Sequence, residues 1–591
     1  MHLSYSTSSY KEQTYKSYSI AESYRKGDKV RKRIIWRIGK LTDQQADQIR
    51  LILDVAQGKK QIVTRLEDIV VQESRSYLDI AVVNHIWDEW KLSEAFDCCA
   101  TVGPLPTHAV ARVLTINRCT DPCSNYSVPA WAEKTALSDV LNIDLSGLND
   151  DKIYYELDKI HKNQVSIENH LFRQTHERNP DSYCFVDYDL STTYFVGHKC
   201  ELSAFGKGKA ECHGRRQVLL GVLINEDGYP FKWDVFPGNT AEVKTLKRNI
   251  NACKTRFGLA DSNVTLVFDR GIISDENGAM IEQSRMKYIS ALDRNQIPTS
   301  GVDLSAFQGL QTSEIHQPPQ LPSGFKKYDE QLYYKDAGVI DGKRFVLGFN
   351  PGMFEQDRKI REEKIASFKT YLKEENKGLG KAKRDRDLEA TKGRIVGELK
   401  RLKIKKYFDA PLLQSITVHT RLKDGSVKMV KSFKAQVQIK KEIIETDKLL
   451  DGVCVFLTNH TERHGRGFKV TPQTIIKAYR DKTKIEDVFK NVKSFLKIRP
   501  LFVNTEAHVK AVYTICILAY FINRYLANKR KEIGEMDYLN SRELYAPFKD
   551  IDITTLLDNR TGKSAKKAVQ LPPETKNLLE KIAMKHVAKP Q

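Results

Sequence analysis

The sequence predicts an α/β protein in which a mixed β-sheet core is interrupted by a largely β insertion and preceded by a helical region. Three observations support this prediction. Short apolar strands alternate with amphipathic helices between residues 183 and 292, and apolar side chains recur at helical spacing between residues 43 and 175. A long stretch of charged helices and scattered strand patterns then leads to a further amphipathic helix, residues 479–496. The chain therefore divides into several regions.

The chain has a strong excess of positive charge. Its 591 residues include 96 Lys and Arg against 75 Asp and Glu, which gives a net charge of +21. A polyanion is the natural partner for such a protein, with nucleic acid as the leading candidate. A chain of this length is expected to hold roughly three or four domains.

Export and membrane insertion are not expected. The N-terminus lacks the apolar stretch of a signal peptide, so the ten cysteines are expected to be thiols in a reducing compartment. The longest apolar run near the C-terminus, residues 512–522, is shorter than the roughly 20 residues that cross a bilayer. We therefore expect a buried helix there, a cytoplasmic protein and no membrane partner.

Residues 1–42 are expected to form a basic N-terminal β-ribbon, with two strands around a glycine-aspartate turn. Its cations, including Arg31, Lys32 and Arg33, could contact DNA phosphates, although a solvated hairpin explains the pattern equally well. Residues 43–178 are expected to be helical, and they form either a DNA-binding region or a supporting bundle.

Residues 179–296 have the pattern of the first part of the core. Its elements follow the order β-β-β-α-β-α-β, with strands at 183–195, 216–224, 229–236, 264–271 and 287–292 and helices at 241–254 and after Ser274. Residues 471–530 would supply the second part with a last, catalytic helix, which completes a ribonuclease-H-like core. Between the two parts, residues 297–470 are expected to form the mainly β insertion with charged helices, and residues 531–591 a C-terminal helical region.

Carboxylates occur where such a core carries its chemistry. Asp187 and Asp189 are two positions apart on the first strand and therefore share a face. Asp269 ends the fourth strand, and Glu486 lies on the late helix. Carboxylates held together repel one another unless a cation neutralises them, and oxygen-only ligation selects Mg²⁺ or Mn²⁺. Two such ions about 4 Å apart can activate a water or a 3′-hydroxyl and stabilise the leaving oxygen of a phosphodiester.

The late helix has two different faces. One narrow stripe, at about 100° per residue, contains Tyr479, Lys482, Glu486 and Lys493, and the opposite face is apolar. Surface ion pairing explains most glutamates that lie among lysines on a helix. The functional alternative is an acid held beside cations that bind DNA phosphate.

Other candidate ligand motifs do not satisfy their spacing rules. The segment TGKS at residues 561–564 lacks the first glycine of a phosphate-binding loop. Cysteines and histidines that are near one another in the sequence do not form paired ligands at zinc-finger spacing; they are Cys119, Cys123, His198, Cys200, Cys212 and His213. We expect neither a structural zinc ion nor an ATP site.

The motifs around the first two acids resemble those of a known family, the bacterial insertion-sequence transposases with an Asp-Asp-Glu triad. The segment YDLSTTYF resembles the family's first motif, which favours Asp189 over Asp187, and VFDRG resembles the second and indicates Asp269. Further similarity runs in the expected order through SYRKGDKVRKRIIWRIGKL, NRCTDPCSNYSVPAW, VLLGVLINEDGYPFKWDVFPGNTAEVKTL and IRPLFVNTEAHVKAVYTICILAYFI. The ordered set is highly specific and covers most of the chain.

The third motif is similar to that of one group in this family, whose last acid lies in a Tyr-x2-Arg-x3-Glu-x6-Lys signature. The matching residues are Tyr479, Lys482, Glu486 and Lys493. Lysine in place of the usual arginine keeps the positive charge but loses bidentate geometry.

The resemblance implies a DDE transposase that moves DNA by cutting and pasting. Asp189, Asp269 and Glu486 would be both the catalytic residues and the ligands of two Mg²⁺ ions per site, for which Mn²⁺ would substitute. The long gap between the second and third acids would hold the largely β insertion. The DNA-binding residues would be Tyr479, Lys482, Lys493, Arg270, Arg31, Lys32 and Arg33.

The implied partners are the terminal inverted repeats of an insertion sequence and its target DNA, bound by a homodimer in a paired-end complex. A freed 3′-hydroxyl would attack the opposite strand to leave a hairpin end and would later attack target DNA. The implied location is the bacterial cytoplasm, in association with the nucleoid. Two alternatives remain open: a catalytically inactive, transposase-derived DNA-binding repressor, and a metal-dependent nuclease with the same core.

Overall fold

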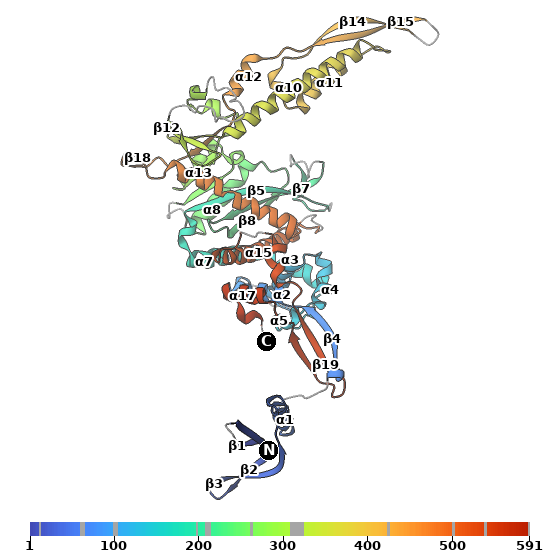
Figure 1. Cartoon of the computed structure of the whole chain (residues 1–591). Coiled ribbons are helices and arrows are strands. Elements are labelled where there is room, and N and C mark those ends of the chain that lie inside the picture. Colours follow the sequence, from blue (N-terminus) through green and yellow to red (C-terminus); the bar gives the residue numbers. More distant parts are fainter. Residues whose placement is uncertain are drawn as a thin grey trace. The chain divides into compact units, whose positions relative to one another are not determined.

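The chain forms two compact units, whose elements are labelled in Figure 1. The first unit contains Met1–Val82, Ala130–Ile143 and Pro547–Gln591, and the second contains Val83–Pro129 and Asp144–Ala546. The three candidate acids all belong to the second unit. The computed structural model describes residues 1–10, 13–59, 66–97, 105–196, 199–206, 214–259, 264–307, 324–421, 426–498, 503–536 and 540–588.

The first unit contains an antiparallel ribbon of three strands, β1 (His2–Tyr10), β2 (Gln13–Lys26) and β3 (Lys29–Gly39). The turn between β2 and β3 contains Gly27, whose φ of +64° suits glycine. Helix α1 (Asp43–Ala56) follows, and it begins at a capping box in which Thr42 and Gln45 hydrogen-bond to each other's backbone.

A second sheet in this unit joins segments that are far apart in the sequence. Strand β4 (Ile69–Ser76) pairs with β19 (Asp552–Asp558), which also pairs with β20 (Ser564–Ala568). The C-terminal region, expected to be helical, thus contains these two strands besides α16 (Ser541–Tyr545) and α17 (Pro573–Lys581).

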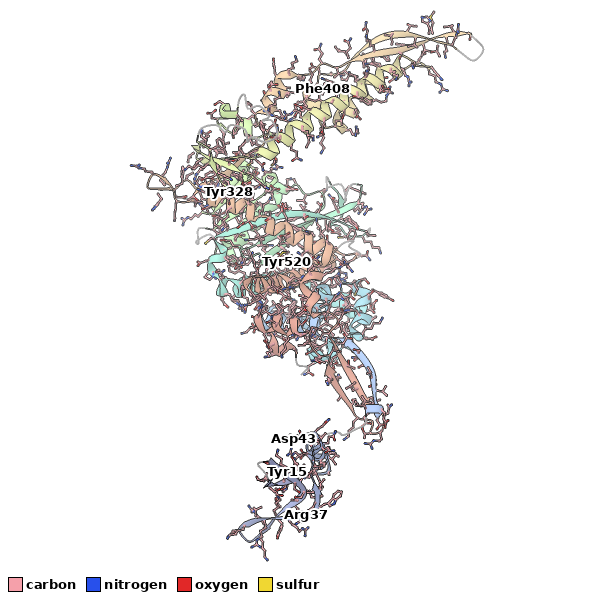
Figure 2. The ribbon with its side chains drawn as sticks, viewed as in Figure 1. Tyr15, Arg37, Asp43, Tyr328, Phe408 and Tyr520 are labelled. Carbon is pink, nitrogen blue, oxygen red and sulfur yellow. The ribbon has the colours of Figure 1, made fainter. Side chains whose placement is uncertain are left out.

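Helices of the second unit gather around α15 (Glu506–Glu532), which packs against α3 (Thr107–Thr120) and α6 (Asp150–Lys162). Among the described residues, α15 alone is long and apolar enough to cross a membrane, but 94% of its apolar window is buried by the protein itself. Tyr520 is one of these buried residues (Figure 2). Other helices of the N-terminal half are α2 (Leu78–Glu89), α4 (Val128–Glu133), α5 (Leu137–Leu141) and α7 (Gln164–Arg178).

A mixed ten-stranded sheet lies at the centre of the second unit and confirms the predicted α/β class. The strand order is β11-β12-β13-β16-β10-β9-β5-β7-β6, with β8 also paired to β7. β9 is parallel to both β5 and β10, and the other neighbouring strands are antiparallel. The strands are β5 (Phe185–Tyr194), β6 (Ala204–Phe205), β7 (Arg216–Ile224), β8 (Pro230–Pro237), β9 (Thr265–Phe268), β10 (Lys287–Ala291), β11 (Lys326–Lys327), β12 (Tyr333–Ile340), β13 (Lys343–Phe349) and β16 (Val453–Thr458).

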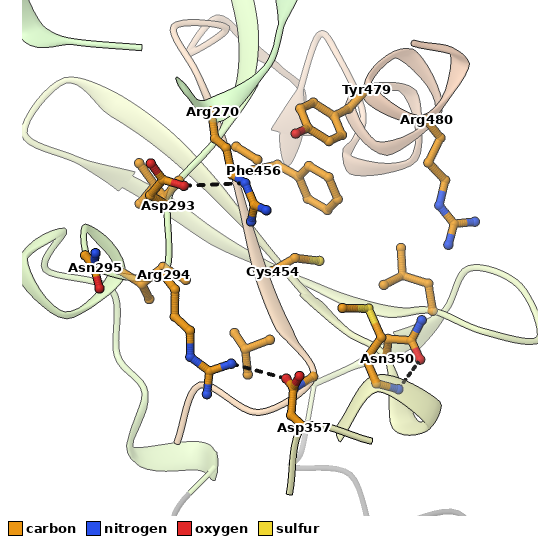
Figure 3. A pocket seen from close by; sticks show the side chains of 17 residues that line it. Arg270, Asp293, Arg294, Asn295, Asn350, Asp357, Cys454, Phe456, Tyr479 and Arg480 are labelled. Carbon is orange, nitrogen blue, oxygen red and sulfur yellow. Dashed lines mark hydrogen bonds and ion pairs between the residues drawn. The ribbon is translucent and has the colours of Figure 1, made fainter. Parts of the chain in front are cut away.

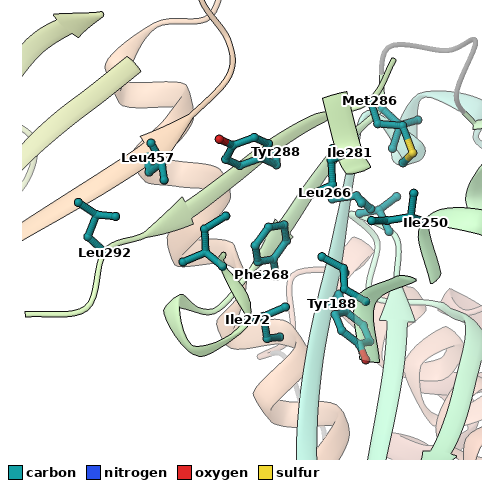
Figure 4. Close-up of a cluster of buried hydrophobic side chains, with 14 of the residues drawn as sticks. Tyr188, Ile250, Leu266, Phe268, Ile272, Ile281, Met286, Tyr288, Leu292 and Leu457 are labelled. Atoms are coloured by element: carbon teal, nitrogen blue, oxygen red, sulfur yellow. The ribbon is translucent and has the colours of Figure 1, made fainter. Parts of the chain in front are cut away.

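Apolar residues cover both faces of the parallel strands. Every residue of β9 is buried, as expected for a strand between two layers. On one face, Leu266 packs in the cluster formed with α8 (Leu246–Thr255) and α9 (Asp275–Gln283) (Figure 4). On the other face, Val267 packs with α13 (Pro472–Asp481). This half of the sheet is therefore packed on both faces.

Four strands of the insertion, β11, β12, β13 and β16, extend the core sheet, because β16 pairs with both β10 and β13, whereas β14 (Leu412–Arg421) and β15 (Val427–Gln436) form a separate two-stranded sheet. We call residues 351–451 the arm, which leaves the sheet after β13 and returns before β16. It contains α10 (Pro351–Leu379), α11 (Leu388–Arg401), β14, β15 and α12 (Lys441–Lys448). A short hairpin between β16 and α13 consists of β17 (Arg463–His464) and β18 (Gly467–Phe468).

The two ends of the arm meet at a backbone hydrogen bond, which the Asn350 N–H donates to the Gly452 carbonyl over 2.8 Å. Gly452 has a φ of +64°, and a Cβ at this position would lie 2.5 Å from the Asn350 carbonyl oxygen. Only glycine fits this close approach. The adjacent buried carboxylate of Asp451 forms ion pairs with Arg294, Arg358 and Arg361.

Candidate active site

The pairing of two parallel strands brings Asp189 and Asp269 together. Tyr188 on β5 pairs with Phe268 on β9, so the aspartates that follow them occupy neighbouring positions on adjacent strands, which are about 5 Å apart. Asp269 comes directly after β9, and its carboxylate accepts a hydrogen bond from the Arg270 N–H at 2.9 Å. Both acids therefore lie at the same point of the sheet.

The late helix is broken at Lys482. The Lys482 carbonyl accepts the Ile485 N–H at 3.0 Å, whereas the Glu486 N–H is 3.5 Å away, so the chain turns more tightly here than an α-helix does. Glu486 follows in the next turn and is exposed. In place of the single α-helix expected from the sequence, the structure has α13 (Pro472–Asp481), α14 (Thr483–Lys490) and a π-helical turn (Asn491–Phe495).

A buried ammonium group lies against Asp269. Lys482 Nζ is 3.2 Å from Asp269 Oδ1, and the Lys482 side chain is only 9% exposed. The Tyr479 hydroxyl donates to the same oxygen at 3.0 Å. Lys482, Asp269 and Glu486 are all close enough to change the pKa of the Asp189 carboxyl. The break in the helix thus places one cation beside Asp269 and within electrostatic range of Asp189.

The acids differ in their ionisation. Burial opposes the ionisation of Asp269, but the neighbouring ammonium, backbone N–H and phenol outweigh it and hold the pKa of Asp269 below its usual value. Burial raises the pKa of Asp189 to about 6, and the charges of Asp269 and Glu486 add to the effect. Burial also raises the pKa of Asp187 to about 7. The strand β5 therefore presents two acids that need a nearby cation to be fully ionised.

Two further predicted DNA-binding residues lie close to these acids. Lys493, in the π-helical turn, donates a hydrogen bond to the Ser191 hydroxyl on β5, two positions after Asp189. Arg270 is exposed and lies 3.4 Å from Asp293. Together with Tyr479 and Lys482, they surround the acids with groups that can bind phosphate.

The predicted ribbon cations lie in the first unit. Arg31, Lys32 and Arg33 are all exposed on β3. Arg33 is paired at 3.0 Å with Glu22 on the neighbouring strand β2. The other two carry charge that no acid of the described residues neutralises within ion-pair distance.

A cavity of about 610 Å³ is lined in part by residues that contact Asp269 (Figure 3). Arg270 and Tyr479 line the cavity and also contact Asp269. Met353 and Phe456, from the insertion, line it too. The insertion therefore shapes the surroundings of the candidate site.

The insertion also holds Tyr479 in place. The rings of Tyr479 and Phe456 meet edge to face, with centroids 5.3 Å apart and an interplanar angle of 69°. Sequence analysis did not identify Phe456 or the ion pair between Lys482 and Asp269, because both contacts join segments that are far apart in the chain. The one available signal was the position of Lys482 on the same stripe as Glu486.

The donor set fits a hard divalent cation. Asp189, Asp269 and Glu486 offer carboxylate oxygens alone, which favour Mg²⁺ or Mn²⁺. Within the described ranges, no three His, Cys, Asp or Glu side chains are gathered closely enough to hold a metal ion, and in this site the Lys482 ammonium lies against Asp269. Three of the cysteines and histidines considered above as zinc ligands lie outside the described residues: His198, Cys212 and His213.

Two aspartates at neighbouring positions on adjacent parallel strands, with a glutamate on a late helix, are the arrangement expected of a DDE transposase. Residues 180–522 match the family model described as the transposase DDE domain, and the chain belongs to this family. Residues 3–65 match the N-terminal domain of IS1634 family transposases. The protein is thus a DDE transposase of the IS1634 family, and it catalyses transposition.

This family assignment corrects the sequence analysis in one respect. The group with the Tyr-Arg-Glu-Lys signature was the wrong assignment, because the N-terminal match is to the IS1634 family. A signature of four spaced residues is a short pattern, and Lys482 already departed from it.

Two solved structures show remote likeness. The piggyBac transposase synaptic complex with hairpin DNA is 8% identical, with a TM-score of 0.33 over 80% of this chain and 80% of that chain. The Mos1 transposase paired-end complex with the left transposon end is 13% identical, with a TM-score of 0.14 over 42% of this chain and 78% of that chain. No curated protein sequence matches the chain.

Proposed function

We propose that this transposase moves its insertion sequence by metal-dependent cutting and pasting, with Asp189, Asp269 and Glu486 as the catalytic acids. The observation that carries the proposal is the ion pair between Lys482 and Asp269, together with the electrostatic influence of Lys482, Asp269 and Glu486 on Asp189. The strand order β8-β7-β5-β9-β10, with β9 parallel to both neighbours, supports the assignment of a ribonuclease-H-like core.

The three acids would hold two Mg²⁺ ions, or Mn²⁺ in their place, which would supply Lewis acidity to activate a water or 3′-hydroxyl and to stabilise the leaving oxygen. Tyr479 keeps Asp269 ionised and oriented through its hydroxyl. Lys482 offsets the charge of the acids in the free protein. With the acids neutralised by bound metal ions instead, the Lys482 ammonium would leave Asp269 and bind the phosphate beside the cleaved bond.

The proposed DNA partners of the protein are the terminal inverted repeats and the target DNA. Lys493 and Arg270, which flank the acids, would position the reacting phosphate. The exposed cations of β3 would bind the DNA backbone farther from it. In this proposal the protein acts as a dimer in a paired-end complex, and the reaction passes through a DNA hairpin intermediate. The reaction takes place at the nucleoid of a bacterial cell.

The proposal is tested by nicking of a labelled insertion-sequence end in the presence of Mg²⁺. Asp189→Asn, Asp269→Asn and Glu486→Gln should each abolish nicking while end binding persists. Asp187→Asn should have a milder effect. Glu543→Gln, at an exposed acid on α16, is the matched control and should nick at the parental rate.

Three outcomes contradict the proposal in different ways. Parental nicking by the Glu486→Gln variant removes this residue from the site. Nicking of any DNA without preference for the ends favours the nuclease alternative. End binding by the wild-type protein without any nicking favours the inactive repressor.

A further inference from the structure

The outer end of the arm carries a concentrated positive charge. Six cations are exposed there, four in the loop that joins α10 to α11 and two on strand β15. We call them the distal arm surface: Lys381, Lys383, Arg384, Arg386, Lys428 and Lys431.

These cations have no acidic partner among the described residues. Several other cations of the arm are neutralised: Arg358 pairs with Asp451 at 3.3 Å, and Arg394 on α11 pairs with Glu375 at 2.9 Å. By contrast, none of the six cations of the distal arm surface forms an ion pair with another described residue. Exposed cations without an acidic partner are available to an external anion.

The distal arm surface is held in a fixed shape. The loop is fastened to the hairpin because the Arg386 N–H donates to the Lys431 carbonyl at 2.9 Å, and the Lys431 N–H donates to Asp385 at 2.8 Å. Thr420 on β14 donates to the Ala382 carbonyl at 2.8 Å. Cations from two separate segments therefore form one pre-ordered surface, so little conformational entropy is lost on binding.

The arm places this surface far from the acids. Helix α10 has 29 residues and is therefore about 43 Å long. Base pairs of duplex DNA rise by about 3.4 Å each, so the helix spans about 12 base pairs, slightly more than one turn of DNA.

We propose that the distal arm surface binds the phosphate backbone of duplex DNA, about one helical turn or more from the reacting phosphate. The inference deepens the proposed function and rests on it for the nature of the substrate. Six unpaired cations, against the two exposed apolar side chains Val427 and Met429, favour a polyanion over a protein partner. The two-stranded ribbon β14-β15 also has the width that a major groove admits.

The test compares two triple variants by the salt dependence of their binding to a 30-base-pair duplex and a 10-base-pair duplex. The first replaces Lys383, Arg384 and Lys431 with Gln. The control replaces with Gln three exposed cations of α10 and α11 that each pair with a glutamate: Lys377, Arg394 and Arg401.

The distal variant should bind the long duplex with a log–log salt slope reduced by about 2–3, since each lost phosphate contact removes about 0.9. Its slope on the short duplex should equal that of the wild type, and the control should match the wild type on both. Equal slopes for the distal variant and the control on the long duplex overturn the proposal. Each variant should have the same thermal unfolding temperature as the wild type, which verifies that it is folded.

A nicking assay distinguishes a failure of this inference from a failure of the proposed function. If wild-type protein nicks insertion-sequence ends but the distal variant keeps the parental slope, the inference about the arm alone fails. If wild-type protein does not nick and the slope still falls in the distal variant, the catalytic proposal fails and the DNA surface stands.

Discussion

The ammonium of Lys482 lies 3.2 Å from a carboxylate oxygen of Asp269 and is almost fully buried. Three acids gathered without a cation would repel one another. Lys482 relieves part of this repulsion in the free protein and therefore occupies space and charge that a divalent metal would otherwise take. In the proposed function, this one side chain would oppose metal binding before the substrate arrives and would support catalysis afterwards.

Removing this ammonium should separate the two effects. Lys482→Met should bind Mn²⁺ about tenfold more tightly in the absence of DNA, a change of about 1.4 kcal/mol, because the competing charge is gone. Nicking at saturating protein should become slower. Titration calorimetry with Mn²⁺ and single-turnover nicking measure the two effects.

Two variants serve as controls for this experiment. Lys482→Arg keeps the charge and should retain much of the nicking rate, and Lys490→Met removes an exposed lysine on the same helix. Unchanged Mn²⁺ affinity in Lys482→Met would show that the ammonium does not compete with the metal.

The buried acids of β5 should make the metal-free protein less stable as the pH rises. The pKa of Asp187 is raised to about 7 and that of Asp189 to about 6, above the value of about 4 in an unfolded chain. A carboxyl whose pKa is higher in the folded than in the unfolded state contributes stability below about pH 4. This contribution is lost as the pH rises to about 7.

Asp187→Asn should therefore raise the free energy of unfolding at pH 8, by an amount on the order of 2–4 kcal/mol, with a much smaller effect near pH 4. Urea unfolding in EDTA measures this difference. Glu543→Gln removes an exposed carboxylate and is the control. A variant at 187 with parental stability at pH 8 would mean that this carboxyl is already neutralised by a partner.

The hydroxyl of Tyr479 should matter more for cleavage than for stability. Tyr479→Phe keeps the contact with Phe456 but removes the hydrogen bond to Asp269, and a hydrogen bond to a charged group contributes about 1.5–3 kcal/mol. We expect nicking to slow by about tenfold or more. Phe456→Leu, which keeps an apolar side chain but loses the ring, should slow nicking by less. Parental rates in both variants would remove the phenol from the catalytic arrangement.

Neutralising the ribbon should weaken DNA binding by about two phosphate contacts. In the triple Gln variant of Arg31, Lys32 and Arg33, the log–log salt slope should fall by about 2 instead of 3, because Arg33 is already paired with Glu22. The fold should persist, since these side chains are exposed. Filter binding at several salt concentrations gives the slope, and an unchanged slope would indicate that the ribbon is a solvated hairpin.

Local patterns were sufficient to predict the core strands and the closeness of two acids. Asp189 lies within an alternating strand and Asp269 ends an apolar one, so the parallel pairing of β5 with β9 makes them neighbours. Three of the four residues of the buried strand β9 are apolar, which identified it without knowledge of its partners.

The rest depended on contacts that no local pattern encodes. The pairing of β16 with β10 joins segments separated by the whole arm, and that pairing delivers Phe456 to Tyr479. A helical wheel treats residues 479–496 as one regular helix and therefore cannot show the break at Lys482. At this break a single tight turn directs the Lys482 ammonium to Asp269.

The way in which the arm joins the sheet bears on how this enzyme could have evolved. Phe349 and Val453, on either side of the arm, are already a cross-strand pair of β13 and β16. A short turn would therefore close the same hairpin, and a lineage could gain, lose or exchange the intervening hundred or so residues in one genetic event without shifting the register of any catalytic strand. Selection for a new DNA substrate can thus act on the length and charge of this segment while the chemistry is inherited unchanged.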